Sequence, residues 1–178
     1  TIFEGGGVGV EAVVRNGEAA ESRFSVMFGS CNKVNYEQPF WPIVQSHSPD
    51  LWIWMGDNVY ADRKRTLQEL PRAWMHSRQS GMNMLDFLFE PAPEQKLRAL
   101  YDAQLAHPGY KAFLDTGVTV LGTWDDHDYG LNDGGAEFPW KAESQRALLD
   151  FLGEPNDSRR RRQEGVYDVR RVPFGDGR

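Results

Sequence analysis

Side chains that could bind a metal or take part in a reaction follow three short apolar segments of the sequence. The first group is a lone thiol, Cys31, and the second is the carboxylate and phenol of Asp57 and Tyr60. The third group places three carboxylates and an imidazole in four consecutive residues, Asp125 to Asp128. Like charges packed so closely raise the free energy of a protein unless a cation or hydrogen-bond donors compensate. The three groups would meet at one sheet edge if the strands that precede them are neighbours.

Each of these groups also has a purely structural interpretation. A Gly-Asp-Asn turn such as the one at Asp57 is common for backbone reasons, and a single cysteine such as Cys31 is often a small buried residue. In the acidic segment, one aspartate could cap a turn, another could face water, and His127 could bond a carbonyl. The other histidines, His47, His76 and His107, lack comparable neighbours in sequence, so we interpret them as structural or exposed.

The elements that must position these residues follow from hydrophobic spacing and from turn residues. Apolar runs predict strands at 24–28, 51–55 and 118–123, and helical spacing predicts helices at 39–48, 93–105, 108–114 and 141–152. In the helix at 39–48, Phe40, Ile43 and Val44 are expected to share the buried face. The alternation of strands and helices predicts an α/β fold with a parallel sheet, which binds ligands beyond the carboxyl ends of its strands.

The remaining segments carry weaker patterns. Residues 1–22 suit a linker or the end of a preceding β element, and residues 63–92 suit an insertion with partial helix. The basic run at 159–162 is most simply a solvated face, and residues 166–174 suggest a strand or hairpin arm.

Composition limits the class of protein. The chain has 178 residues, of which 40% are hydrophobic, enough for one globular core. A net charge of −6 argues against a nucleic-acid partner, which would require a basic face. The one cysteine excludes an intrachain disulfide, and no run approaches the roughly 18 apolar residues of a membrane span. Neither P-loop, paired-cysteine zinc site nor Gly-x-Ser-x-Gly elbow occurs. The first residue is not Met, so the N-terminus looks cut and a targeting segment could precede it.

Three blocks of sequence resemble the PhoD-like alkaline phosphatase and phosphodiesterase family, in the order in which that family has them. They are the segments at 28–32 (FGSCN), 54–60 (WMGDNVY) and 122–128 (GTWDDHD), and the similarity extends over roughly residues 23–170. The family belongs to the metallophosphatase superfamily and is related to purple acid phosphatases. The resemblance therefore implies an αββα sandwich with largely parallel strands and flanking helices. It also makes an extracytoplasmic location plausible.

The resemblance implies a catalytic centre of ferric iron and calcium. Cys31 and Tyr60 match the family's thiolate and phenolate ligands of iron, and Asp57 matches the carboxylate shared by iron and calcium. Asp126 would bind the second metal, His127 would approach the substrate as donor or acid, and Asn132 would be a further calcium ligand. From the donor atoms alone, zinc or manganese would also fit. The reaction implied is hydrolysis of a small phosphate ester by metal-activated water.

One departure from the family pattern concerns the rest of the ligand set. The family's remaining histidine ligands come from a later segment, and this chain has no histidine after His127. We therefore expect residues 23–178 to form the N-terminal part of a PhoD-like domain whose C-terminal part is absent, and this stretch alone to be inactive.

Two other functions remain open from the sequence. Asp126 and Asp128 could form an Asp-x-Asp pair of a magnesium phosphatase that passes through an aspartyl phosphate. That hypothesis leaves Cys31, Asp57 and Tyr60 without a role. Alternatively, the chain could bind a metal or a partner without catalysis, which the missing histidines would explain. Substrate preference between monoesters and diesters, and oligomeric state, do not follow from the sequence.

Overall fold

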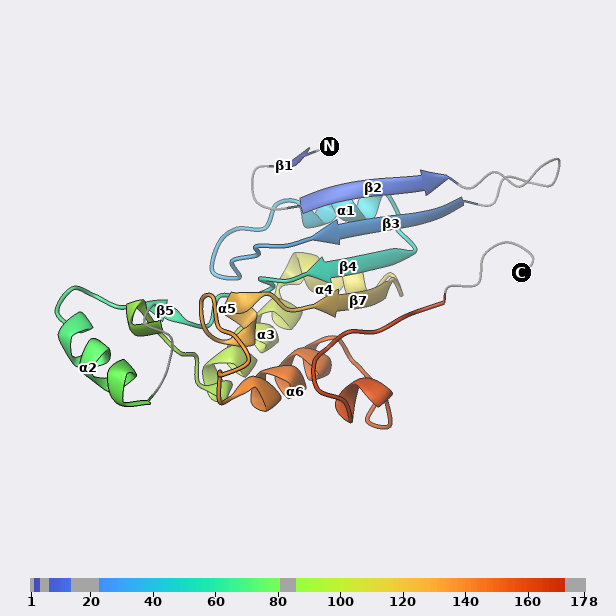
Figure 1. Ribbon diagram of the computed structural model, residues 1–178. Helices are drawn as coiled ribbons and strands as arrows, with labels where there is room; N and C mark the ends of the chain where they lie inside the picture. Colours follow the sequence, from blue (N-terminus) through green and yellow to red (C-terminus); the bar gives the residue numbers. More distant parts are fainter. Residues whose placement is uncertain (1, 4–6, 14–22, 81–85, 172–178) are drawn as a thin grey trace.

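The fold is a mixed α/β structure built on a five-stranded sheet (Figure 1). The computed structural model describes residues 2–3, 7–13, 23–80 and 86–171. In spatial order the strands are β1 (Ile2–Phe3), β2 (Gly7–Val13), β3 (Arg23–Gly29), β4 (Leu51–Met55) and β7 (Thr119–Thr123). Strands β3, β4 and β7 are parallel neighbours, whereas β1 and β2 pair antiparallel. The predicted parallel sheet is confirmed, and the start of the chain contributes a β element to it.

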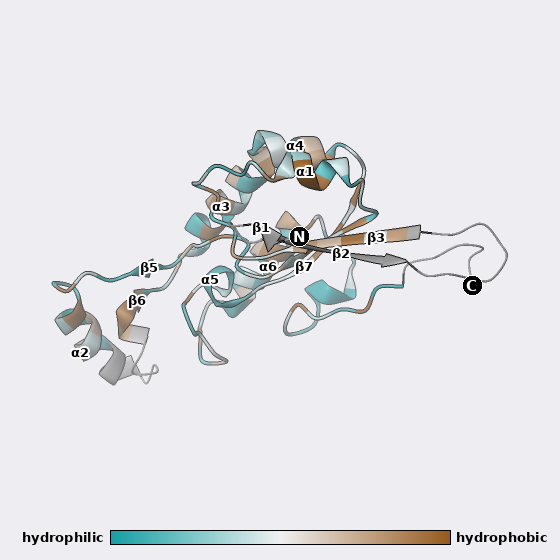
Figure 2. Cartoon of the chain, turned by 90° about the horizontal axis from the view of Figure 1, so that it is seen from above, coloured by the Kyte–Doolittle hydropathy of each residue, from teal (hydrophilic) through white to brown (hydrophobic). Residues whose placement is uncertain are grey.

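Four helices flank the parallel strands, at the positions that hydrophobic spacing predicts. They are α1 (Trp41–Ser46), α3 (Glu94–Ala106), α4 (Pro108–Leu114) and α6 (Lys141–Phe151). Figure 2 shows α1, α3 and α4 together on one side of the sheet. Within the described residues there is no second large sheet on the other side, so the complete αββα sandwich stays a prediction.

The core between the sheet and these helices is aromatic. Trp52 and Trp54 alternate along β4 and therefore point to the same face, where Trp41 of α1 contacts both, with ring centroids 5.2 and 5.8 Å apart. Trp41 is fully buried, whereas Ile43 is 40% exposed. The predicted buried face of this helix was therefore wrong at Ile43, because α1 begins at Trp41 and turns the indole inward instead.

The segment at 63–92 forms an arm that extends away from the sheet (Figure 1). It contains α2 (Leu70–Ser80), the short 3-10 helix η1 (Asp86–Leu88), and a two-stranded pair of β5 (Arg63–Lys64) with β6 (Phe89–Glu90). The guanidinium of Arg63 bonds Glu69 at 2.9 Å and also bonds Glu90, which ties the base of the arm together. The predicted partial helix is confirmed, and the interpretation of the segment as an insertion stays a prediction.

The basic run at 159–162 is not uniformly solvated, which corrects the sequence-based interpretation. Arg160 lies in the 3-10 helix η2 (Arg159–Arg161), and its side chain is 3% exposed. Its guanidinium pairs with Glu154 at 3.0 Å and donates to the carbonyl of Gly122 on β7 at 2.9 Å. Arg160 is buried because it joins the last described segment to the sheet. That segment, 166–171, forms no strand, and residues 172–174 lie outside the described residues.

Glu154→Gln is expected to destabilise the fold by about 3 kcal/mol, because removing one member of a buried ion pair leaves the other charge uncompensated. Burial alone would raise the pKa of Glu154, but hydrogen bonds from Ser158 and Arg160 outweigh it and keep the pKa below 4.5. The stabilisation is therefore present above pH 4.5 and lost as the pH falls through the folded-state pKa. Urea unfolding at neutral and acidic pH measures both effects. Arg159→Gln, on a side chain that is 69% exposed, is the control and should change little.

Candidate metal centre

The loops that follow β3, β4 and β7 lie against one another. The backbone N–H of Cys31 donates to the carbonyl of Gly56 at 3.3 Å, and that of Asn32 donates to Asp57 at 2.8 Å. Gly56 has a φ of +99°, and a Cβ atom there would lie 2.7 Å from Cβ of Asp125. Glycine is thus required where the second loop touches the third. The parallel strands therefore bring all three groups of candidate residues to one sheet edge.

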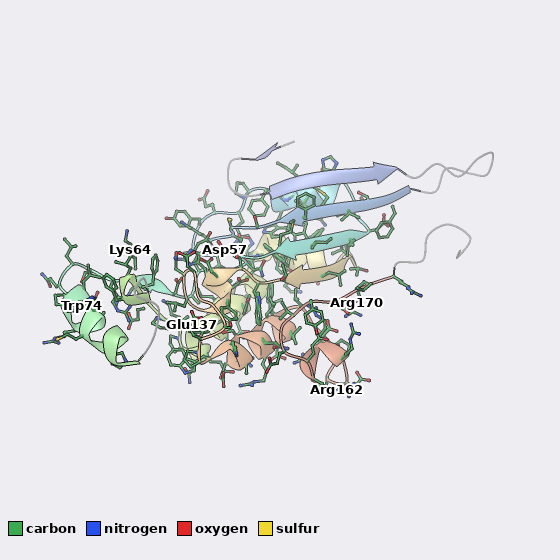
Figure 3. The ribbon with its side chains drawn as sticks, in the orientation of Figure 1. Asp57, Lys64, Trp74, Glu137, Arg162 and Arg170 are labelled. Carbon is green, nitrogen blue, oxygen red and sulfur yellow. The ribbon has the colours of Figure 1, made fainter. Side chains whose placement is uncertain are left out.

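Asp57, Asp126 and His127 form a cluster suited to a metal ion. One possible ligand atom of each residue lies within 4.8 Å of those of the other two. Asp57 is 7% exposed, and its buried Oδ1 atom has no hydrogen-bond partner among the described residues. An unpaired buried carboxylate oxygen is unfavourable, and a cation would compensate it. Figure 3 shows Asp57 at the end of the parallel strands, close to α5 (Asp126–Tyr129).

Cys31 and Tyr60 lie beside the same carboxylate. The phenol of Tyr60 donates to Oδ2 of Asp57 at 2.9 Å, and Sγ of Cys31 is 3.9 Å from that oxygen. Cys31 is exposed, so its thiol is accessible from solvent. Cys31 and Asp57 both have positive φ values, 55° and 51°, a strained conformation for residues with a side chain. Strain of this kind often occurs at functional sites. Here both strained residues carry side chains that approach each other, the Cys31 thiol and the Asp57 carboxylate.

The surroundings of the Asp57 carboxyl and the Tyr60 phenol shift the pKa values of both groups. Burial raises the pKa of Asp57 above 3.8, and the charges of Asp126 and Asp125 raise it further. Burial and the bond to Asp57 raise the pKa of the Tyr60 phenol well above its ordinary value. The phenol is therefore protonated in this arrangement, and a metal ligand at Tyr60 would first have to lose that proton. The ligand roles of Cys31 and Tyr60 stay predictions.

The buried carboxylate of Asp128 connects the loop after β4 to the loop after β7. The acidic segment contains the helical turn α5, which hydrophobic spacing did not predict, and Asp128 within it is completely buried. Its carboxylate accepts backbone N–H bonds from Asp57 at 3.2 Å, Asn58 at 3.1 Å and Asp125 at 2.7 Å. Burial raises the pKa of Asp128 to about 7, while these donors act in the opposite direction. Asp128 thus organises the loops and does not face the cluster's ligand atoms.

Asn58 is a site residue that sequence reasoning missed. It is fully buried, and its side-chain amide donates to Asp128 at 2.6 Å and to the carbonyl of Thr123 at 2.8 Å. The amide therefore links the loop after β4 to the end of β7. The only signal in the sequence is its position next to Asp57.

His127 is oriented by Asp62, a second residue that sequence reasoning missed. Oδ1 of Asp62 lies 2.7 Å from Nδ1 of His127, and the Asp62 side chain is only 2% exposed. The other oxygen of Asp62 accepts the backbone N–H of Asn132 at 2.9 Å. Because Nδ1 is engaged, Nε2 is the nitrogen that remains for a metal or a substrate. A sequence signal exists, since Asp62 ends the same loop that begins at Gly56.

Asp62→Asn is expected to lower the pKa of His127. Burial alone would lower this pKa, but the hydrogen bond and charge of Asp62 outweigh it and raise the pKa above 6.5. Without the carboxylate of Asp62, the largest influence that raises this pKa is lost, and the imidazole should stay neutral to a lower pH. A titration of the histidine ring signals by NMR measures the change, with exposed His47 as the internal reference. An unchanged His127 titration in the variant would contradict this role of Asp62.

Asp126 begins α5 and Asn132 follows that helix, and each uses part of its bonding capacity locally. The amide of Asn132 donates to Asp133 at 2.6 Å. Asp126 accepts backbone N–H bonds from His127 at 2.9 Å and from Asp133 at 2.8 Å. These bonds fix the direction of the Asp126 carboxylate, which joins the cluster. The calcium-ligand role of Asn132 stays a prediction.

The remaining histidines have structural or exposed positions, as predicted. His107 caps α4, accepting the backbone N–H of Tyr110 on Nδ1 at 3.4 Å. His47 is the C-cap residue of α1 and is exposed, as is His76 on α2.

Comparisons with protein-family models, curated proteins and solved structures gave no match to this chain. The fold and the site by themselves define an α/β protein with a candidate metal centre at the carboxyl ends of three parallel strands. No helix in the described part of the chain is long and apolar enough to cross a membrane.

Proposed function

We propose that the chain forms part of a metal-dependent phosphoesterase of the PhoD-like type. The observation that carries the proposal is the cluster of Asp57, Asp126 and His127, together with the unpaired buried oxygen of Asp57. Two carboxylates and an imidazole at the carboxyl ends of parallel strands suit a metal that activates water. A small phosphate ester is the proposed substrate, because its negative charge complements a metal centre in an otherwise acidic protein.

The proposed metals are ferric iron and calcium, held by Cys31, Tyr60, Asp57, Asp126 and Asn132. When bound, such ions polarise phosphoryl oxygens and lower the pKa of a bound water. The chain's own contribution is positioning. Asp128 and Asn58 fix the two loops that carry the carboxylates, and Asp62 holds His127 through Nδ1. The other nitrogen of His127 is then available to bond the phosphoryl group or to protonate the leaving oxygen.

The finer fold is part of the same proposal, with residues 23–178 as the N-terminal part of an αββα sandwich. On the sheet face opposite Trp52 and Trp54, Phe28, Ile53 and Leu121 are only half-buried. Met55, on the same face, is 52% exposed. An apolar sheet face of this kind usually packs on another layer, which supports a further sheet there.

The geometry gives less support to an aspartyl-phosphate mechanism. In an Asp-x-Asp pair, the second carboxylate must exchange a proton with the substrate. Asp128 is completely buried, and both of its oxygens already accept hydrogen bonds from the protein. A non-catalytic metal-binding role keeps the cluster but predicts no turnover.

The experiment that tests the proposal combines an absorption spectrum with an assay on the protein that contains this chain. Ferric iron should produce a visible tyrosinate-to-iron charge-transfer band, and the loaded protein should hydrolyse aryl phosphates. Tyr60→Phe should remove the band, because the phenolate ligand is lost. Tyr36→Phe, on a side chain that is 68% exposed, is the control and should keep it. A band that survives in Tyr60→Phe would refute the ligand assignment, and metal binding without hydrolysis would favour the non-catalytic role.

A further inference from the structure

A groove of about 520 Å³ lies along α6 and shares no lining residue with the metal cluster. Ligand sites for small organic molecules typically measure roughly 300 to 1,000 Å³, so the groove has a suitable size. Trp124 and Tyr129 line it from the segment around α5, and Arg146 and Leu149 line it from α6. Residues 161–165, at the end of η2 and just after it, form the remaining wall.

The wall after η2 is fixed by side-chain hydrogen bonds. The amide of Gln145 on α6 donates to the carbonyls of Arg160 and Gln163, both at 2.8 Å, and its oxygen accepts the N–H of Gly165 at 3.1 Å. Arg161 bonds Asp150 on α6 at 2.7 Å. The groove is therefore formed before a ligand arrives, and binding would not have to order this segment.

The aromatic part of the groove offers surfaces for a flat ring. The rings of Trp124 and Tyr129 lie 5.0 Å apart in an edge-to-face arrangement, and the Tyr129 hydroxyl donates to the carbonyl of Gly135 at 3.1 Å. That bond fixes the tyrosine ring. Ala142 and Leu149 add apolar surface from α6. Aromatic ligands pack favourably on surfaces of this kind.

The charged part of the groove is cationic in a protein whose net charge is −6. Lys141, Arg146, Arg161 and Arg162 line it, with Glu164 as the one acidic lining residue. The guanidinium of Arg162 is exposed and has no ion pair or side-chain hydrogen bond within the described residues. Arg146 is 53% exposed, and in the part of the chain that the structure describes it pairs only with Glu143, at 3.3 Å. Both guanidinium groups can therefore donate paired hydrogen bonds to an anion.

We propose that the groove along α6 is a second ligand site that binds a small aromatic anion, such as an aryl phosphate. The ring packs on Trp124 and Tyr129, and the anionic group bonds Arg146 and Arg162. This site goes beyond the proposed metal centre and does not depend on it, because the two share no residues.

Calorimetric titration with naphthyl phosphate in the presence of a metal chelator tests the proposal, since the chelator separates the groove from the metal centre. Naphthol supplies the ring without the charge, and inorganic phosphate supplies the charge without the ring. Naphthyl phosphate should bind at least about tenfold more tightly than either. The double variant Arg146→Gln and Arg162→Gln should weaken its binding by about tenfold or more.

A matched pair of single variants locates the contact. Arg162→Gln should weaken binding, whereas Arg159→Gln, in the same basic run but outside the groove, should not. Both side chains are on the surface, so neither substitution should disturb folding, and circular dichroism checks this. Equal binding of naphthol or phosphate, equal losses in the two variants, or binding that disappears with the chelator would each overturn the proposal.

Discussion

Asp57→Asn is expected to reduce the affinity of the protein for iron by at least about 100-fold, since even partners that only orient a metal ligand contribute 10- to 100-fold. The variant removes the negative charge of Asp57 from the cluster and leaves a neutral amide in its place. Asp57 also accepts a hydrogen bond from the Tyr60 phenol and lies beside the Cys31 thiol. Loss of the Asp57 carboxylate therefore affects every predicted iron ligand in this region. Titration with ferric iron, followed by absorbance, measures the affinity.

The same variant has a second, opposite signature in the metal-free protein. Burial and the charges of Asp126 and Asp125 raise the pKa of Asp57, so its ionised form is unfavourable in the fold above pH 3.8. Removing the charge should leave the metal-free melting temperature unchanged or raise it, while it abolishes the stabilisation by metal. Asp125→Asn is the control, since Asp125 is exposed and lies outside the cluster. Equal loss of iron binding in both variants would contradict the assignment of Asp57.

Asp128→Ala is expected to destabilise the protein by about 3 kcal/mol or more, because several buried donors lose their acceptor at once. These donors are the backbone N–H groups of Asp57, Asn58 and Asp125, the side-chain amide of Asn58, and the hydroxyl of Tyr101. Equilibrium unfolding in urea measures the loss. The metal affinity should fall as well, since the two loops that carry the cluster lose the carboxylate that holds Asp57 and Asn58 against α5.

Tyr101→Phe provides the matched control for this network. The Tyr101 hydroxyl donates to Asp128 at 3.3 Å, so its removal should cost about 1 kcal/mol. An Asp128→Ala protein as stable as the parent, yet unable to turn over substrate, would instead favour the aspartyl-phosphate mechanism.

The sequence predicts the regular elements well because their signals are local. The run at Leu51–Met55 is apolar and bounded by turn residues, and the structure forms β4 over those same residues. The helix at Pro108–Leu114 likewise begins at a proline and ends before Gly117, as its residues indicate. The order of the strands within the sheet has no local signal of this kind. It could be expected only because strands and helices alternate along the chain.

The features that the sequence does not predict depend on contacts between distant residues. The burial of Arg160 depends on Glu154 and on a carbonyl of β7, and no periodicity indicates either partner. Asp62 and His127 are 65 positions apart, so their pairing appears only when the loops meet. Asp128 is a further example. Its position in the acidic segment suggests a catalytic or metal-binding residue, whereas its complete burial in the structure indicates that it organises the loops.

Within the candidate site, residue types were predictable and roles were less so. The cluster contains Asp57, Asp126 and His127, which the sequence singles out by their position after strands. Cys31 and Tyr60 lie next to Asp57 and contact its carboxylate. A role as metal ligand would require the thiol and the phenol to lose their protons, and that deprotonation depends on the ion itself.

The central claim is that three loops gather around shared cations, and anomalous diffraction at the iron edge tests it most directly. Crystals of the protein grown with ferric iron should show an anomalous peak within bonding distance of Cys31, Asp57 and Tyr60. A peak elsewhere on the molecule, or a fully ordered cluster with no peak under saturating iron, would contradict the account.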